Sequence, residues 1–169
     1  MQRLALAVLA VAGLALAGSA SAAAPSVEET SVSFTMSSAT CPNLPPGTTI
    51  VATGRQTSIS SESTDRNGVT TVTNTTTAHG TATDQAGNTY VFNYANHYRI
   101  ANTGPIDPIL TGVMVDSFSL AGNGPAHLNN GFRAVFTINV ATGQASFVEL
   151  TSRGDPIDFT TGESLCDPL

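Results

Sequence analysis

The residues of this chain best suited to chemistry crowd into positions 79–100, HGTATDQAGNTYVFNYANHYRI. Two histidines, an aspartate, an arginine and four aromatic side chains occupy these 22 positions. Histidine beside a carboxylate is typical of acid–base chemistry or metal binding. The same residues also fit the two arms of a β-hairpin around the turn DQAG. Which of them share a face of the sheet therefore decides what chemistry is available.

Three short segments predict hairpin turns, because each ends in glycine after a strand-like run. They are DRNG at 65–68, DQAG at 84–87 and VATG at 140–143. Asp at the first position and Gly at the last suit a type I turn closed by a left-handed residue. Thr, Val, Ile and aromatic residues flank all three turns and favour strands. We predict hairpins centred at Asn67, Ala86 and Thr142, and strands at 28–37, 49–64, 69–83, 88–100, 110–121, 131–140 and 144–152.

The central turn fixes a register in which small residues face large ones. Ala82 falls beside Tyr90 and Gly80 beside Phe92, an alternation that suits the tapered interior of a small barrel. In the third hairpin the even positions form the apolar face: Phe132, Phe136, Ile138, Val148 and Leu150. We predict an all-β fold, a single antiparallel meander closed or nearly closed as a β-barrel of about seven or eight strands. A two-sheet β-sandwich is the alternative.

This register places the histidines too far apart to share a metal ion. His79 falls opposite Asn93 and His97 opposite Thr75, which is roughly 13 Å along the sheet at about 3.3 Å per residue. Zinc binds its ligand atoms at about 2 Å. We therefore expect no metal site and no cofactor, and surface positions for both histidines. His127 lies in a loop whose geometry the sequence leaves open.

The first 22 residues have the layout of a secretory signal peptide. Arg3 precedes an uncharged Ala/Leu/Val run from Leu4 to Ala17, and small residues end at Ala22. The run is shorter than a transmembrane span of about 20 residues. We predict a secreted protein from which residues 1–22 are removed, with 23–169 forming one all-β domain.

The two cysteines, Cys41 and Cys166, lie near the two ends of the predicted mature chain. Export exposes them to an oxidising compartment, where an intramolecular disulfide persists. Two free thiols, or a bridge between two copies of the chain, are the alternatives.

The charge of the chain is acidic, with a formal net value of −6. Without Arg3 of the leader, five arginines stand against twelve carboxylates, a net charge of −7. Phosphate backbones and anionic lipids repel such a protein. We expect neither nucleic acid nor a membrane as a partner.

Two turn phrases carry a family resemblance. TDRNG at 64–68 and TDQAGNTYVFNY at 83–94 resemble segments of uncharacterised small secreted β-proteins of high-GC bacteria, over residues 64–133. The resemblance implies export and a β-fold. It implies no activity and transfers no functional residue.

The inward face of the predicted barrel contains polar groups that require partners. A buried tyrosine or amide side chain needs hydrogen bonds, which each other, ordered water or a ligand can supply. A network satisfied within the protein is one interpretation. The other is a pocket for a modest, partly apolar molecule. The residues predicted to line that pocket are Tyr90, Tyr94, Tyr98, Asn96 and Gln56.

Two classes of function remain open. The preferred class is a non-catalytic exported protein, either a binding barrel or a surface interaction module. The sequence contains no G-x-S-x-G or H-E-x-x-H motif. The alternative is a cavity enzyme that uses Asp116, or an interior tyrosine, as acid or base. Asp116 is the candidate because its position is even-numbered, like those of Met114 and Phe118, and is therefore predicted to face inward. The identity of a ligand and the oligomeric state stay open.

Overall fold

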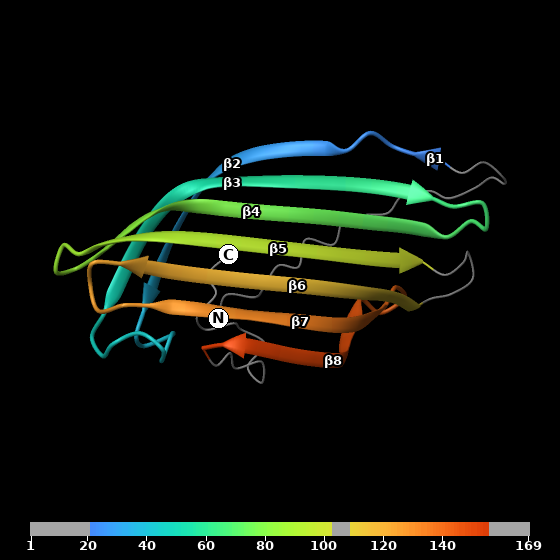
Figure 1. Ribbon diagram of the computed structural model, residues 1–169. Helices are drawn as coiled ribbons and strands as arrows, with labels where there is room; N and C mark the ends of the chain where they lie inside the picture. The colour runs from blue at the N-terminus through green and yellow to red at the C-terminus, as the bar shows by residue number, and fades with distance from the viewer. Residues whose placement is uncertain (1–20, 103–108, 156–169) are drawn as a thin grey trace.

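The fold is one antiparallel β-sheet, seen in the computed structural model, which describes residues 21–102 and 109–155 (Figure 1). The described strands run in the order β1-β3-β4-β5-β6-β7-β8, and β2 pairs with β3 on the same edge as β1. Each predicted strand is confirmed to within a few residues. The strands are β1 (Ser21–Ala22), β2 (Ser26–Ser37), β3 (Thr49–Thr64), β4 (Thr70–Asp84), β5 (Thr89–Asn102), β6 (Ile109–Gly122), β7 (Leu128–Asn139) and β8 (Gln144–Gly154).

The first two hairpins have the predicted turns and register. The backbone N–H of Gly68 donates to the Asp65 carbonyl at 3.1 Å, and φ of Gly68 is 80°. In the next hairpin, Gly80 lies opposite Phe92 as predicted. A Cβ atom at Gly80 would stand 2.6 Å from Cε1 of Phe92. The glycine therefore lets the aromatic ring lie directly over the neighbouring strand.

The third hairpin begins one residue earlier than predicted. Asn139 pairs with Gln144, and its Oδ1 accepts hydrogen bonds from two backbone N–H groups of the turn at 3.0 and 3.2 Å. Asparagine forms such a turn with its side chain, whereas Val140 has no acceptor to do so. A β-bulge further along returns the strands to the predicted register. Because Val148 lies at this bulge and is 68% exposed, its predicted place on the apolar face was wrong.

The hydrophobic core lies at the end of the sheet where β3 and β5 begin, on the left in Figure 1. Phe92 and Phe118 are buried there, and the Phe34 ring of β2 packs against them at centroid distances of 5.0 and 6.1 Å. In a flat sheet β2 and β6 would be about 19 Å apart. The end of β2 must therefore bend across the even-numbered face. The loop after it adds Cys41 and Leu44 to the core.

The sheet is open, so the predicted barrel closure is corrected. Among the described residues, β2 pairs only with β3 and β8 only with β7, which leaves two edges. The described strands form one sheet and not the two layers of the alternative sandwich. On β3 and β4, the buried apolar side chains all belong to the core: Ile50, Ala52, Ala78 and Ala82. Beyond it, β3 and β4 present Ser58, Ser60, Asn74 and Thr76 on the same face, and these polar residues supply little hydrophobic drive to close the sheet.

The predictions of a disulfide and of a cleaved signal peptide fall partly outside the described residues. Cys41 is fully buried at 0% exposure, and Cys166 lies outside the described ranges, so the disulfide stays a prediction. Residues 1–20 of the predicted leader also lie outside them. β1 occupies its last two residues, and cleavage after Ala22 would remove this strand from the edge. No helix in the described part of the chain is long and apolar enough to cross a membrane.

Candidate functional site

Four of the five predicted ligand residues lie together in the middle of the even-numbered face. Strand pairing aligns them in three consecutive rows that run across β3 to β7, which we call the middle rows. The rows are Gln56–Ala78–Tyr94–Phe118–Asn130, Ser58–Thr76–Asn96–Asp116–Phe132 and Ser60–Asn74–Tyr98–Met114–Ala134. The fifth predicted residue, Tyr90, lies two rows away toward the core end.

Asp116 is the charged group at the centre of the middle rows, and it is only 4% exposed. Its Oδ2 accepts hydrogen bonds from the Tyr94 hydroxyl at 2.9 Å and from Nδ2 of Asn96 at 2.6 Å. Its Oδ1 is buried and has no hydrogen-bond partner among the described residues. A carboxylate offers about four acceptor positions. Oδ2 of Asp116 therefore accepts two hydrogen bonds, whereas Oδ1 accepts none from the described residues.

The Asp84 carboxylate shows what a fully satisfied carboxylate looks like in this sheet. Its Oδ1 accepts the backbone N–H groups of Ala86 and Asn88, each at 2.9 Å. Its Oδ2 accepts Nδ2 of Asn88 at 2.8 Å and the Tyr90 hydroxyl at 3.0 Å. These bonds, led by that from the Asn88 side chain, lower the pKa of Asp84.

Tyr90 belongs to this turn and not to the middle rows. Its side chain is buried at 2% exposure, and its hydroxyl donates to Asp84. Burial first, and then that hydrogen bond, raise the pKa of Tyr90 above its ordinary value. A Cβ atom at Gly124 would meet the hydroxyl oxygen, so the β6–β7 loop also packs on this ring. Tyr90 therefore contacts both the β4–β5 turn and the β6–β7 loop.

A second set of polar side chains in the middle rows, on β3 and β4, forms hydrogen bonds among its own members. Ser58 and Thr76 share a hydrogen bond of 2.9 Å between their hydroxyls, and Thr76 donates to Oδ1 of Asn74 at 2.9 Å. Nδ2 of Asn74 donates to the Ser60 hydroxyl at 2.8 Å. None of the five predicted ligand residues takes part in this chain of bonds. The chain of bonds lies on β3 and β4, and its member Thr76 is the strand partner of Asn96.

Tyr98 and Gln56 lie in the two rows on either side of the row that contains Asp116, and both are half-buried. Neither side chain makes a hydrogen bond to another described residue. Tyr98 lies in the row next to Asp116, on the side away from the core. Its ring and hydroxyl are therefore available to a molecule lying on this part of the face.

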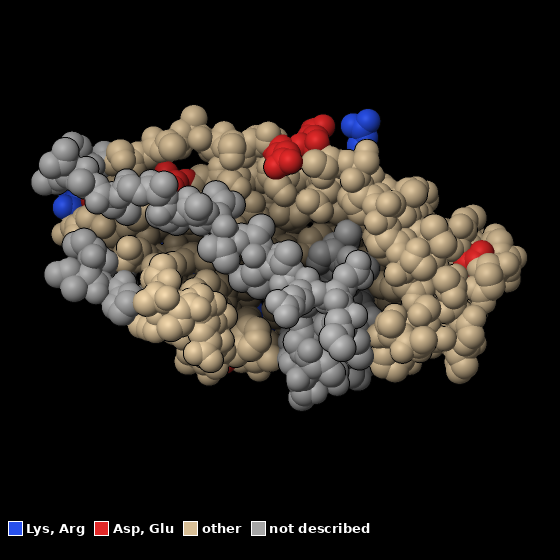
Figure 2. Space-filling model, turned by 180° about the vertical axis from the view of Figure 1, so that it is seen from behind, with Lys and Arg blue, Asp and Glu red and all other residues tan. Residues whose placement is uncertain are grey.

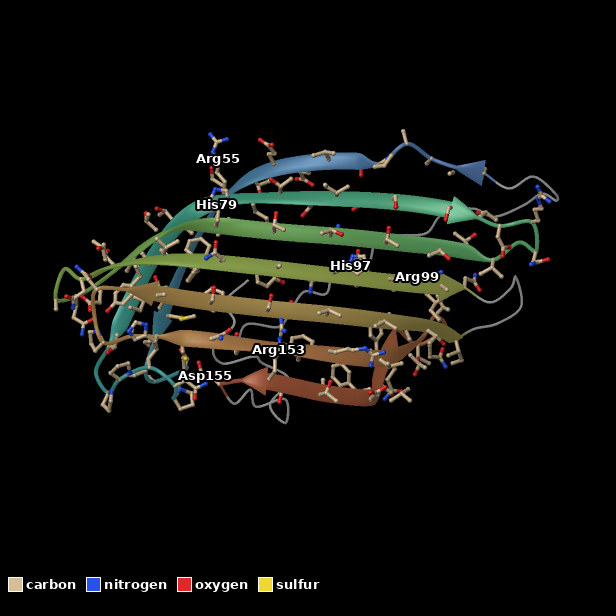
Figure 3. All side chains as sticks on the ribbon, viewed as in Figure 1. Arg55, His79, His97, Arg99, Arg153 and Asp155 are labelled. Atoms are coloured by element: carbon tan, nitrogen blue, oxygen red, sulfur yellow. The ribbon has the colours of Figure 1, made fainter. Side chains whose placement is uncertain are left out.

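The histidines lie on the opposite, odd-numbered face, as predicted. His79 and His97 are exposed, and Nδ1 of His97 contacts the Thr75 hydroxyl at 2.9 Å. Figure 3 shows them spread along the sheet with Arg55, Arg99 and Arg153. The described residues contain no group of three or more His, Cys, Asp or Glu side chains placed to hold a metal ion.

A depression of about 500 Å³ lies elsewhere, at the turn end of β4, β5 and β6. Tyr90 is the only predicted ligand residue that lines it, beside Thr83, Val91 and Asn123. It contains no charged side chain and does not reach Asp116.

Comparisons of the chain with protein-family models, with curated proteins and with solved structures find no match.

Proposed function

We propose that this chain is an exported, non-catalytic binding protein that holds a modest, partly apolar molecule on the middle rows of its even-numbered face. The observation that carries the proposal is the Asp116 carboxylate, which is buried yet has an unpartnered Oδ1. Buried polar groups of native proteins are nearly always hydrogen-bonded, and an exception asks for an explanation. A ligand that supplies the missing bond is such an explanation.

The surroundings of Asp116 supply the apolar contacts that a small ligand needs. Tyr98 and Met114 occupy the next row, and Phe132 is the strand partner of Asp116. Binding sites for small molecules combine aromatic and aliphatic walls with a few polar groups that fix orientation. The middle rows have this composition.

The alternative function, acid–base catalysis by Asp116 or by a tyrosine, rests on the same carboxylate. A cavity enzyme needs a second reacting group within hydrogen-bond reach of the substrate. The two groups that bond Asp116 are the Tyr94 hydroxyl and the Asn96 amide, and both serve as donors to Oδ2. This arrangement positions the carboxylate. The one acid–base group beside Asp116 in this arrangement is the Tyr94 hydroxyl, whose hydrogen is already donated to Oδ2, so binding is the better supported function.

The proposal is tested with 2-phenylethanol, a neutral probe that has a ring and one hydroxyl. Titration into ¹⁵N-labelled protein should shift the backbone amide signals of 94–98 and 112–118. The Tyr94→Phe variant should bind it more weakly, by roughly 0.5 to 1.5 kcal/mol, because one hydrogen-bonding group is lost. Glu149→Gln, on the opposite face, is the matched control and should bind normally. Signals that shift equally on both faces would refute the proposal, as would signals that stay unchanged at millimolar concentrations of this probe and of its amine and carboxylate analogues.

A further inference from the structure

We infer that the ligand of the middle rows is a cation: an organic ammonium group that donates to Oδ1 of Asp116, attached to a small apolar or aromatic body. This inference rests on the proposed binding function and names the chemical class of the ligand. Three features of the face lead to it: the missing partner, the sign of the charges and the aromatic surroundings.

The missing partner of Asp116 must be a donor. Tyr94 and Asn96 both direct hydrogens at Oδ2, so the carboxyl acts as an acceptor in this site. Oδ1 has the lone pairs of an acceptor and nothing to fill them. A ligand with only acceptor atoms, such as a ketone or a carboxylate, would leave this oxygen unsatisfied. An N–H or O–H group would satisfy it.

The basic side chains of the described strands lie on one face only, whereas carboxylates lie on both faces. Every arginine and histidine in these strands has an odd-numbered position, and the strands contain no lysine: Arg55, His79, His97, Arg99, Arg133 and Arg153. The even-numbered positions of β2, β3 and β6 carry Glu28, Glu62 and Asp116 instead. Most of the described residues visible in Figure 2 are uncharged, and acidic side chains lie together at the upper edge.

The placement of the basic side chains on one face leaves Asp116 without a counter-ion in the described strands. The two ion pairs of the sheet, Arg55 with Glu29 at 4.0 Å and Arg133 with Glu149 at 3.2 Å, use odd-numbered positions. A buried charge is costly unless an opposite charge compensates it. A neutral hydroxyl that donates to a carboxylate already forms a charge-assisted hydrogen bond, and an ammonium adds the attraction between opposite charges, which is strong where water is excluded. A cationic donor therefore gains more at this oxygen than a neutral one.

The aromatic side chains around Asp116 favour the same class of ligand. The faces of tyrosine and phenylalanine rings carry partial negative charge and attract cations within about 6 Å. Tyr94 shares a hydrogen bond with the carboxylate, and Tyr98 lies half-buried in the next row. Met114, opposite Tyr98 in the same row, and Ile100, in the row beyond it, are half-buried and offer an apolar surface for the body of the ligand.

The burial of Oδ1 limits the size of the group that binds it. The oxygen is closed to solvent, so neighbouring side chains must shift before a ligand reaches it. A primary ammonium is compact and donates in three directions. A bulky quaternary ammonium has no N–H and would not satisfy the oxygen.

The experiment compares three probes that share a ring and differ in charge: 2-phenylethylamine as its ammonium, 2-phenylethanol and 3-phenylpropanoate. Binding to the purified protein is followed by amide shifts of the middle rows at neutral pH and fixed salt. We expect the ammonium to bind at least about tenfold more tightly than the alcohol, and the carboxylate to bind weakest. This comparison uses the unmodified protein and does not depend on any variant.

Variants then assign the preference to one oxygen. Asp116→Asn should reduce the affinity for the ammonium to that for the alcohol, whereas Glu149→Gln should preserve the tenfold difference. If the alcohol binds as tightly as the ammonium, the cation inference fails and the binding function stands. If none of the probes shifts the middle rows, both fail. An ammonium preference that survives in Asp116→Asn would come from the overall negative charge and would overturn the inference.

Discussion

Replacing Asp116 in two different ways separates the roles of its oxygens in folding. Asp116→Ala removes the acceptor of the Tyr94 hydroxyl and of the Asn96 amide, which bond it at 2.9 and 2.6 Å. Each buried donor left without a partner costs roughly 1 to 3 kcal/mol. Removal of the one unsatisfied oxygen, Oδ1, stabilises the protein by a similar amount. We expect a net loss of about 1 to 3 kcal/mol in the free energy of unfolding.

Asp116→Asn has a different expected result. The asparagine oxygen keeps an acceptor for both donors, and the substitution removes a buried charge that has no counter-ion. The loss of charge assistance in two hydrogen bonds opposes this gain. These changes nearly cancel, and the free energy of unfolding should stay within about 1 kcal/mol of that of the unmodified protein.

The assay is urea unfolding, with the free energy taken from the midpoint and slope of each curve. Glu149→Gln is the control for loss of a carboxylate, because its ion pair with Arg133 is exposed and should contribute under about 1 kcal/mol. If Asp116→Asn destabilised the protein as much as Asp116→Ala, the charge would be needed for folding. The conclusion that Oδ1 lacks a partner would then be wrong.

The remaining predictions concern the core end, the pH range and the disulfide. Gly80→Ala should destabilise the protein by about 2 to 3 kcal/mol in urea unfolding, because its Cβ would stand 2.2 Å from a backbone oxygen; Gly68→Ala, with φ of 80° and open space, should cost only about 1 to 2 kcal/mol. Because burial raises the pKa of Tyr90 above 10.0, stability is full below pH 10 and is lost as the pH rises through the folded pKa; Tyr90→Phe should remove this dependence in alkaline unfolding curves. Intact mass after alkylation without reductant should show no reactive thiol at Cys41 or Cys166, and two alkylated thiols would exclude the predicted disulfide.

The parts of the fold that were predictable from the sequence depend on local chemistry. Turns ending in Gly68 and Gly87 fix the pairing of the strands on either side, and period-two alternation then assigns every side chain to a face. That is why the opposition of Gly80 and Phe92, and the outward position of both histidines, followed from the sequence. The third turn was misplaced by one residue because the Asn139 side chain, and not the backbone pattern, sets where it begins.

The parts that were not predictable depend on contacts distant in sequence. The β5–β6 connection, residues 103–108, has no turn signal of the kind seen in the hairpins, so the alignment of Asn96 with Asp116 had no local marker. The even-numbered position of Asp116 was the only basis for assigning it to the correct face of the sheet. Closure failed as a prediction because it depends on how apolar side chains are distributed along the strands. That distribution bends β2 over one end and leaves the other end open.

The same uneven distribution connects the core to the candidate site. β5 passes from the buried Phe92 to Tyr94 and then to Asn96, and β6 passes from the half-buried Met114 through Asp116 to the buried Phe118. The backbone of both strands is therefore fixed by tight packing immediately beside the two donors and the carboxylate. Side chains on such strands are positioned more rigidly than side chains on loops, which lowers the entropy lost when a ligand binds. The hydrogen bonds from Tyr94 and Asn96 fix the carboxylate further and hold Oδ1 in one orientation. A donor that reaches this oxygen thus meets a group already set for it, because the residues that build the core also orient the site.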